Sequence, residues 1–250
     1  MKSRLLVCAL AALVLLAGTA RHAQPALADE GEVDLLLVLA SDVSRSVDDR
    51  KHRLQRDGYA AAIVDPRVVR AMMAGPSGRI ALCFVEWAGE FEQEVIVDWM
   101  PIASSADAEA ASKRIREAAR SFWGRTSISS AIDYSVQQLL RSPFQSARRV
   151  IDVSGDGTNN NGRDVTLARD AAIAQGITIN GLVILSETPL PSNPSHTHPP
   201  GGLTAYYENN VIGGPGAFVL EAQGFESFGQ LLVSKLVKEI AQAAPQRRRS

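Results

Sequence analysis

Cysteine is nearly absent from this chain, which has two cysteines in 250 residues. Cys8 lies in an apolar N-terminal stretch that we expect to be removed, which leaves Cys83 as a lone thiol in the segment RIALCFVEW. A single cysteine forms no intramolecular disulfide, and apolar neighbours are more typical of a small buried side chain than of a nucleophile. The sequence therefore excludes a disulfide-stapled scaffold and disfavours a cysteine-dependent enzyme.

Long apolar runs are missing beyond the N-terminus. Residues 1–28 contain the basic, apolar and small-residue parts of a secretory signal, in the order MKSR, LLVCALAALVLLAG and ALA. No later stretch approaches the roughly 20 apolar residues that cross a bilayer. We therefore predict a signal peptide at 1–28, cleaved after Ala28 or alternatively after Ala20, no membrane span, and export to the periplasm or the medium.

An excess of positive charge is absent as well. The whole chain has 26 Lys and Arg against 27 Asp and Glu, and the signal peptide removes three basic residues and no acid. The remaining 23 basic and 27 acidic residues give a formal charge of −4. This balance disfavours nucleic acid as a partner. The short basic segment 244–250 is predicted to be a solvated tail.

Apolar segments that alternate with amphipathic ones predict the fold class. Residues 33–40 form a continuous apolar run, typical of a strand buried on both faces of a parallel sheet. Strands predicted at 79–88 and 91–100 are joined only by Gly89 and Glu90, which indicates an antiparallel hairpin.

Three further strands and seven helices complete the predicted order of elements. The strands are predicted at 148–155, 177–185 and 216–222, and the helices at 46–64, 66–75, 104–123, 127–140, 163–175, 203–211 and 225–241. This order predicts an α/β fold: a doubly wound, mostly parallel six-stranded sheet with one antiparallel edge strand and helices on both faces. We expect one domain over residues 29–243.

Polar side chains cluster where the first predicted strand ends. The segment ASDVSRSV places Asp42, Ser44 and Ser46 at alternate positions just before a helix. Taken alone, Ser46 is explained as the N-cap of that helix and Asp42 as a turn residue. Sites in doubly wound sheets, however, lie at the carboxyl ends of the parallel strands. Two more loops, carrying Thr126 and Asp156, are expected at this edge.

This pattern resembles the metal-ion-dependent adhesion site of von Willebrand factor type A domains. The shared features are D-x-S-x-S after the first strand, a distant threonine and an aspartate after the fourth strand. The resemblance covers essentially the whole chain after the signal peptide. The predicted hairpin and the segment VIGGPGAFVLEA also resemble those of a bacterial branch of exported type A-like proteins. It implies that Asp42, Ser44, Ser46, Thr126 and Asp156 hold Mg²⁺ (or Mn²⁺), with the aspartates acting partly through water. Hydroxyl and carboxylate oxygens are the donors that such hard cations prefer.

Three loops depart from the family pattern. Val43 and Arg45 stand where glycine is frequent, Gly124 and Arg125 replace a glycine pair, and Gly155 replaces a threonine. None of these changes removes an implied ligand. The two arginines add positive charge beside the ion, which we expect to affect the choice of partner.

The resemblance implies a binding module rather than an enzyme. In such a module the ion bridges to an Asp or Glu carboxylate of a protein partner. A metal-dependent hydrolase acting on phosphate or ester is the alternative, but Ser44 stands where aspartyl-phosphate phosphatases need a second aspartate, and VSGDG lacks the G-x-S-x-G pattern of serine hydrolases. A scaffolding domain with an empty metal site is the third possibility.

The segment 186–202 is long for a loop in a compact domain, and such loops are often functional. It leaves the carboxyl end of the fifth predicted strand, so we expect it to overhang the site and to tune partner specificity. Its two histidines, His196 and His198, lack a third ligand, which predicts a solvated loop rather than a second metal site. Trp87, Trp99 and Trp123 are predicted to pack in the core or at the sheet edge.

Overall fold

A six-stranded sheet is the framework of the computed structural model, which describes residues 31–242. The predicted signal peptide and basic tail lie outside the described residues. The strands lie in the order β3-β2-β1-β4-β5-β6, and their bounds are β1 (Leu36–Asp42), β2 (Ile80–Trp87), β3 (Gln93–Ile102), β4 (Arg149–Gly155), β5 (Thr178–Ile184) and β6 (Val219–Ala222). Among these six strands of the described chain, only the β2–β3 pair is antiparallel, so the predicted sheet with its antiparallel edge strand is confirmed. The β2–β3 connection spans residues 88–92 and is longer than the two-residue turn predicted.

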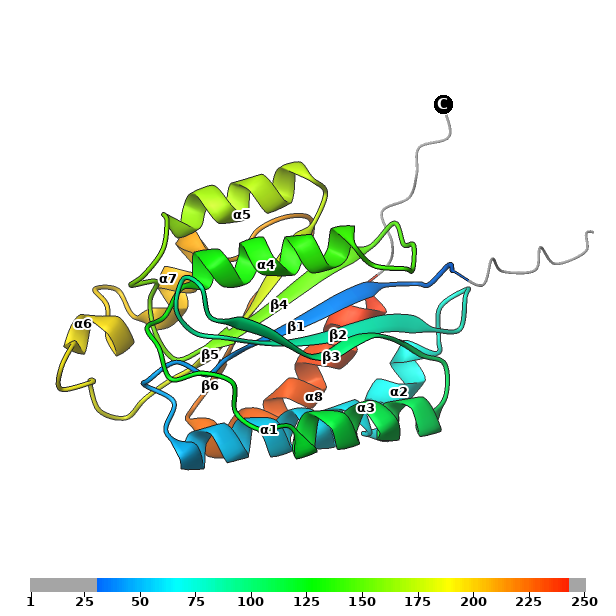
Figure 1. The fold of residues 1–250 in the computed structure, drawn as a ribbon, viewed down its shortest axis with the longest axis horizontal. Helices are drawn as coiled ribbons and strands as arrows, with labels where there is room; N and C mark the ends of the chain where they lie inside the picture. Colours follow the sequence, from blue (N-terminus) through cyan, green and yellow to red (C-terminus); the bar gives the residue numbers. More distant parts are fainter. Residues whose placement is uncertain (1–30, 243–250) are drawn as a thin grey trace, which may run out of the picture.

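Helices cover both faces of the sheet (Figure 1). One layer contains α1 (Asp49–Ile63), α2 (Pro66–Met72), α3 (Ser105–Glu117) and α8 (Phe225–Ala241). The other layer contains α4 (Ile128–Leu140), α5 (Val165–Ala174) and α7 (Leu203–Asn210). The long loop after β5 carries an additional single-turn helix that the sequence did not predict, α6 (Pro194–Thr197), which lies beyond the strand ends at the left of Figure 1.

Capping side chains decide where the helices begin. Asp48 accepts a hydrogen bond from the backbone N–H of Lys51 at 2.8 Å and is therefore the N-cap of α1. The assignment of this cap to Ser46 was wrong, because the Ser46 hydroxyl instead donates a hydrogen bond to Asp156. Ser104 and Ser127 cap α3 and α4, at the residues where the sequence predicts these helices to begin.

Helix α3 ends at Glu117 and is therefore shorter than the helix predicted at 104–123. The following segment turns back toward the loop between β1 and α1, where the Arg120 guanidinium donates to the backbone carbonyls of Val43 and Val47, each at 2.7 Å. Arg120 also stacks on Trp123, whose side chain is 58% exposed. The prediction that Trp123 packs in the core or at the sheet edge is therefore not met in the core, because the side chain is exposed and residues 118–123 brace the loop after β1.

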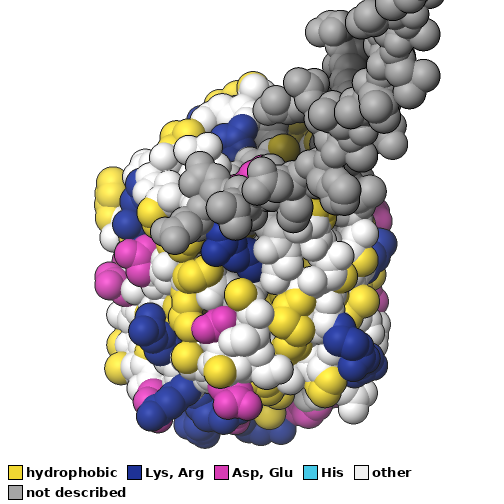
Figure 2. Space-filling view, turned by 90° about the vertical axis from the view of Figure 1, so that its right-hand side faces the viewer, with side chains coloured by type: hydrophobic (Ala, Val, Ile, Leu, Met, Phe, Trp, Pro, Cys, Tyr) yellow, Lys and Arg dark blue, Asp and Glu magenta, His cyan; other side chains and the backbone are white. Residues whose placement is uncertain are grey.

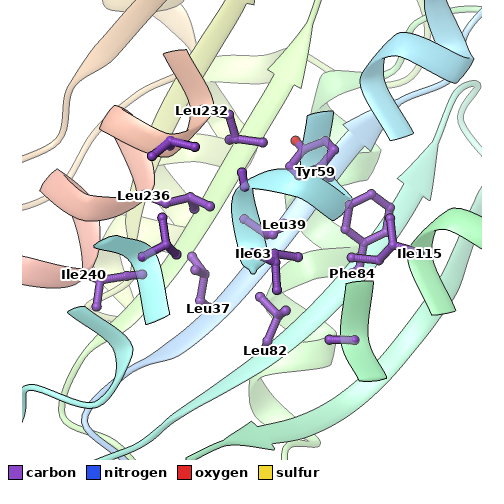
Figure 3. Packing of buried hydrophobic residues seen from close by; sticks show 14 of the residues in the cluster. Leu37, Leu39, Tyr59, Ile63, Leu82, Phe84, Ile115, Leu232, Leu236 and Ile240 are labelled. Atoms are coloured by element: carbon purple, nitrogen blue, oxygen red, sulfur yellow. The ribbon is translucent and has the colours of Figure 1, made fainter. Parts of the chain in front are cut away.

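Two apolar clusters form the core, one on each face of the sheet. Alternate residues of β1 serve the two clusters: Leu37 and Leu39 face α1 and α8, while Val38 and Ala40 face the α4 layer. Figure 3 shows the first cluster, in which the two leucines lie against Ile63 of α1 and residues of α8. The continuous apolar run of β1 is thus explained by burial on both faces. Cys83 is fully buried in the second cluster, and burial raises the pKa of its thiol to about 12.

A charged cluster that the sequence did not predict lies inside this core. Lys235 of α8 places its Nζ 2.5 Å from Asp152 Oδ1 and 3.6 Å from Glu239 Oε1, and all three side chains are fully buried. Asn180 also donates a hydrogen bond to Glu239. Burial raises the pKa of Glu239 to about 7 and raises the pKa of Asp152, while Lys235 opposes both shifts. The cluster joins α8 to β4 and β5.

The amino-terminal edge of the parallel strands lies at the end of the molecule that faces the viewer in Figure 2. On the described part of this face, hydrophobic side chains are interspersed with basic and acidic ones. Within residues 31–242, no helix combines the length and the apolar character needed to cross a membrane.

Candidate metal centre

The five predicted site residues meet at the carboxyl-terminal edge of the sheet, on the left of Figure 1. Asp42 is the last residue of β1, and Ser44 and Ser46 lie in the loop that leads to α1. Thr126 lies just before α4, and Asp156 directly follows β4. Because β1 and β4 pair in parallel, their carboxyl ends are adjacent and bring these loops together.

A chain of hydrogen bonds links the three hydroxyls to a carboxylate. Thr126 Oγ1 donates to Ser44 Oγ at 3.0 Å, and the Ser44 and Ser46 Oγ atoms lie 3.2 Å apart. Ser46 Oγ donates to Asp156 Oδ1 at 2.5 Å. Asp42 joins the group through its Oδ1, which accepts from the backbone N–H of Ser44 at 2.7 Å. The structure therefore brings all five side chains into one contiguous cluster.

Two buried carboxylates in this cluster are poorly compensated. Asp42 and Asp156 are fully buried, and the Oδ2 atom of each has no hydrogen-bond partner among the described residues. The Lys51 ammonium lies 3.5 Å from Asp156 Oδ2 and is bound to the backbone oxygen of Ser46 at 2.8 Å. Burial, together with the charge of Asp156, raises the pKa of Asp42 to about 7, although hydrogen bonds from Ser44 oppose the shift. Such a pair is costly unless a cation balances it.

The spacing of the oxygens fits an octahedral divalent cation. Ligands about 2.1 Å from Mg²⁺ lie about 3.0 Å from their neighbours in an octahedron. The separations from Thr126 to Ser44 and from Ser44 to Ser46, 3.0 and 3.2 Å, match that value. Within residues 31–242, no group of three or more His, Cys, Asp or Glu side chains is arranged for a metal ion. The candidate centre is not a group of this kind, because most of its donors are hydroxyls.

His196 belongs to the site, although it was predicted to lie in a solvated loop. It is 2% exposed, and its Nε2 lies 3.3 Å from Thr126 Oγ1. Burial lowers the pKa of His196, which favours the neutral imidazole. His198, two residues further, is exposed as predicted. Gly157 is the one feature of the sequence that is consistent with His196 in the site, because a Cβ at position 157 would collide with the His196 ring.

A steric reason explains why residue 155 is glycine, where the family pattern has threonine. A Cβ at this position would lie 2.6 Å from the Tyr207 hydroxyl and 3.0 Å from Asp42 Oδ2. Glycine therefore allows the buried Tyr207 to approach the site beside Asp42. Within residues 31–242 the Tyr207 hydroxyl has no hydrogen-bond partner, and burial raises its pKa. The threonine of the family pattern does not fit against this tyrosine.

A pocket of about 290 Å³ opens over Ser46 and Thr126. Its wall includes Leu190 and His196 from the long loop, which confirms that this loop overhangs the site. Arg45 and Arg125 also line the pocket, are exposed, and form no ion pair with another described residue. The mouth of the site is therefore positively charged.

Three solved structures of low sequence identity share this fold. Proximal thread matrix protein 1 from the mussel byssus, solved with zinc at its metal-ion-dependent adhesion site, has 16% identity and a TM-score of 0.57 over 83% of this chain and 46% of its own. Conserved hypothetical protein BatB from Bacteroides thetaiotaomicron has 17% identity and a TM-score of 0.55 over 84% of this chain and 100% of its own. A von Willebrand factor type A protein from Catenulispora acidiphila has 13% identity and a TM-score of 0.51 over 84% of this chain and 42% of its own. This chain thus spans about half the length of the mussel protein.

Sequence comparison places the chain in a family. A comparison with curated proteins finds no match. The family model described as "Protein of unknown function (DUF1194)" matches residues 32–244. The chain therefore belongs to this family, and it has the fold of von Willebrand factor type A domains.

Proposed function

We propose that the protein is an exported binding module that uses a divalent cation, Mg²⁺ or Mn²⁺, to bind an Asp or Glu carboxylate of a protein partner. The ligands of the cation are Asp42, Ser44, Ser46, Thr126 and Asp156. The observation that carries the proposal is the pair of buried carboxylates, each with one oxygen that no hydrogen bond satisfies, beside three hydroxyls at octahedral spacing.

The residues around the centre are suited to an anionic ligand. When bound, the cation supplies a positive charge and a coordination position for a carboxylate. The pocket above Ser46 and Thr126 has room for one or two side chains of a partner, and Arg45 and Arg125 line it. Acidic partners are therefore attracted to this edge of the sheet.

The structural neighbours support a binding role and an extracellular setting. One is a matrix protein of the mussel byssus with zinc at its adhesion site, and another is the pilus adhesin SpaC from Lactobacillus rhamnosus GG, with a TM-score of 0.58 and 10% identity. Export is proposed from the signal peptide predicted at residues 1–28. The domain itself is assigned to residues 29–243.

A metal-dependent hydrolase is less well supported by the same geometry. The contact between Thr126 and His196 superficially resembles a nucleophile with its base. The Thr126 hydroxyl, however, donates its hydrogen to Ser44 and is almost fully buried. Its proton is therefore not directed to the imidazole, as general-base activation requires.

Affinity capture from the exporting cell tests the proposed function. The wild-type protein and the Asp156→Ala variant are compared as bait, each with Mg²⁺ and with EDTA, with Asp133→Ala as a control that removes an exposed acid. We expect a partner to be retained only by the wild type and the control, and only with Mg²⁺. A partner retained equally in all conditions contradicts the metal bridge. Turnover of phosphate or ester substrates that Asp42→Ala abolishes favours the hydrolase.

Reversal of the two pocket arginines is expected to weaken capture of the acidic partner. The double variant Arg45→Glu, Arg125→Glu should lower the association rate about tenfold or more at low ionic strength, because it removes electrostatic attraction. The difference should shrink toward 1 M NaCl, where charges are screened over about 3 Å. Surface plasmon resonance measures the association rates of the wild type and of the double variant. The control Arg70→Glu, Arg114→Glu changes the net charge equally at exposed helix positions, and an equal loss in this control contradicts the assignment.

A further inference from the structure

We propose that His196 is a positioning residue, which holds the Thr126 hydroxyl in the orientation required for cation binding and so couples closure of the loop 186–202 to the metal centre. This inference rests on the proposed function because it requires a cation at the five-residue site. The five-position family pattern assigns no role to this histidine.

A closed ring of hydrogen bonds surrounds Thr126. The backbone N–H of Thr126 donates to Asn160 Oδ1 at 3.0 Å, and Asn160 Nδ2 lies 3.3 Å from His196 Nδ1. His196 Nε2 returns to Thr126 Oγ1 at 3.3 Å. The backbone and the side chain of one residue are therefore linked through an amide and an imidazole that come from two other loops.

The ring of hydrogen bonds assigns the proton on His196. A backbone N–H is always a donor, so the Asn160 atom facing Thr126 is the oxygen and the atom facing His196 is the NH₂ group. His196 Nδ1 is therefore an acceptor. In a neutral imidazole the remaining proton then lies on Nε2, which donates to Thr126 Oγ1.

This assignment determines how many lone pairs of Thr126 Oγ1 remain free. The hydroxyl hydrogen points to Ser44 Oγ at 3.0 Å, and one lone pair accepts from His196. The second lone pair remains free for a cation. A neutral donor performs this task without adding a positive charge beside the ion, which an ammonium group in the same place would do.

The same histidine fastens the long loop to the site. His196 lies in the single-turn helix α6, and its backbone oxygen accepts from the N–H of Thr158 at 2.9 Å. The space for its ring exists because residue 157 is glycine. Since the ring is almost completely buried, it leaves Thr126 only when the loop opens. Cation binding and loop closure therefore favour each other, with equal coupling in both directions.

Mn²⁺ titration followed by electron paramagnetic resonance tests the role of His196. Loss of an outer hydrogen bond to a metal ligand typically costs about 10–100-fold in affinity, and we expect a loss of this size for His196→Ala. His196→Gln, which keeps an N–H donor, should restore most of the affinity. The exposed His198→Ala is the matched control and should bind as the wild type does. In the wild type, Mn²⁺ should also slow hydrogen exchange of residues 190–198.

Three results would overturn the inference. Mn²⁺ binding that is unchanged in His196→Ala removes the role of the histidine while leaving the metal centre intact. A ¹⁴N coupling of directly bound strength in the Mn²⁺ spectrum shows that His196 is itself a ligand. Equal losses in His196→Ala and His196→Gln, with unchanged unfolding in EDTA, show that the donated hydrogen bond is irrelevant. Absence of any Mn²⁺ binding by the wild type instead contradicts the proposed function as a whole.

Discussion

Replacement of Lys235 by methionine is expected to destabilise the domain by about 3–5 kcal/mol, because it leaves two buried acids without their counter-charge. Lys235 lies 2.5 Å from Asp152 and 3.6 Å from Glu239, and none of the three side chains is exposed. Methionine fills nearly the same volume, so the loss reports the charge rather than a cavity. Unfolding in urea, followed by circular dichroism, measures the change in the free energy of unfolding.

A control and a compensating change separate the charge effect from packing. Lys113→Met alters an exposed lysine and should change the free energy of unfolding by less than about 0.5 kcal/mol. Adding Asp152→Leu to Lys235→Met should recover part of the lost stability, since apolar replacements of buried ion pairs are often tolerated. A Lys235→Met variant as stable as the Lys113→Met control contradicts the account of this cluster.

The stability of Lys235→Met should depend strongly on pH. Burial already raises the pKa of Glu239 to about 7 and raises that of Asp152, and both are expected to rise further without the lysine that opposes the shift. An acid whose pKa is higher in the folded than in the unfolded state binds more protons when folded, so stability falls as pH rises through the folded pKa. We therefore expect a larger destabilisation at pH 8 than at pH 5. Urea titrations at both values measure the difference.

Asp42→Asn is expected to abolish stabilisation by Mg²⁺ without destabilising the metal-free protein. At 100 times its dissociation constant, Mg²⁺ adds about 2.7 kcal/mol to a protein that binds it only when folded. That gain corresponds to roughly 5–11 °C in the Tm of a domain of this size. In EDTA at pH 8 the variant should be at least as stable as the wild type, since it removes a buried carboxylate with an unsatisfied oxygen. Thermal unfolding of both proteins in Mg²⁺ and in EDTA measures the two effects.

The same experiment at two pH values tests the charge of Asp42. Its pKa, raised to about 7 by burial and by Asp156, implies that a proton must leave before a cation binds. Stabilisation of the wild type by Mg²⁺ should therefore be larger at pH 8 than at pH 5.5. Asp133→Asn, at an exposed position, should behave as the wild type does. A Mg²⁺ shift that survives in Asp42→Asn contradicts the ligand assignment.

The sheet and the convergence of the five site residues were predictable because they depend on local patterns. Continuous apolar runs mark strands buried on both faces, and parallel strands bring their carboxyl ends together whatever the details of packing. The loop motif with Asp42, Ser44 and Ser46 follows β1 directly, so its position requires no long-range information.

Other features depend on contacts between distant segments. His196 contacts Thr126, which is 70 positions away in sequence, and Lys235 of α8 contacts Asp152 of β4 only because α8 packs against the sheet. A histidine in a proline-rich loop and a lysine on an amphipathic helix are ordinarily exposed, so local reasoning assigns them to solvent. The early end of α3 has the same cause, because the Arg120 contacts with the loop after β1 replace a further helical turn.

Isothermal titration of Mn²⁺ into the wild type and into Asp156→Asn tests whether the five residues form a metal centre. We expect one ion per wild-type chain and no measurable binding by the variant, whose circular dichroism spectrum should match that of the wild type. Equal binding by both proteins, or no binding by the wild type, would contradict a metal centre formed by these residues.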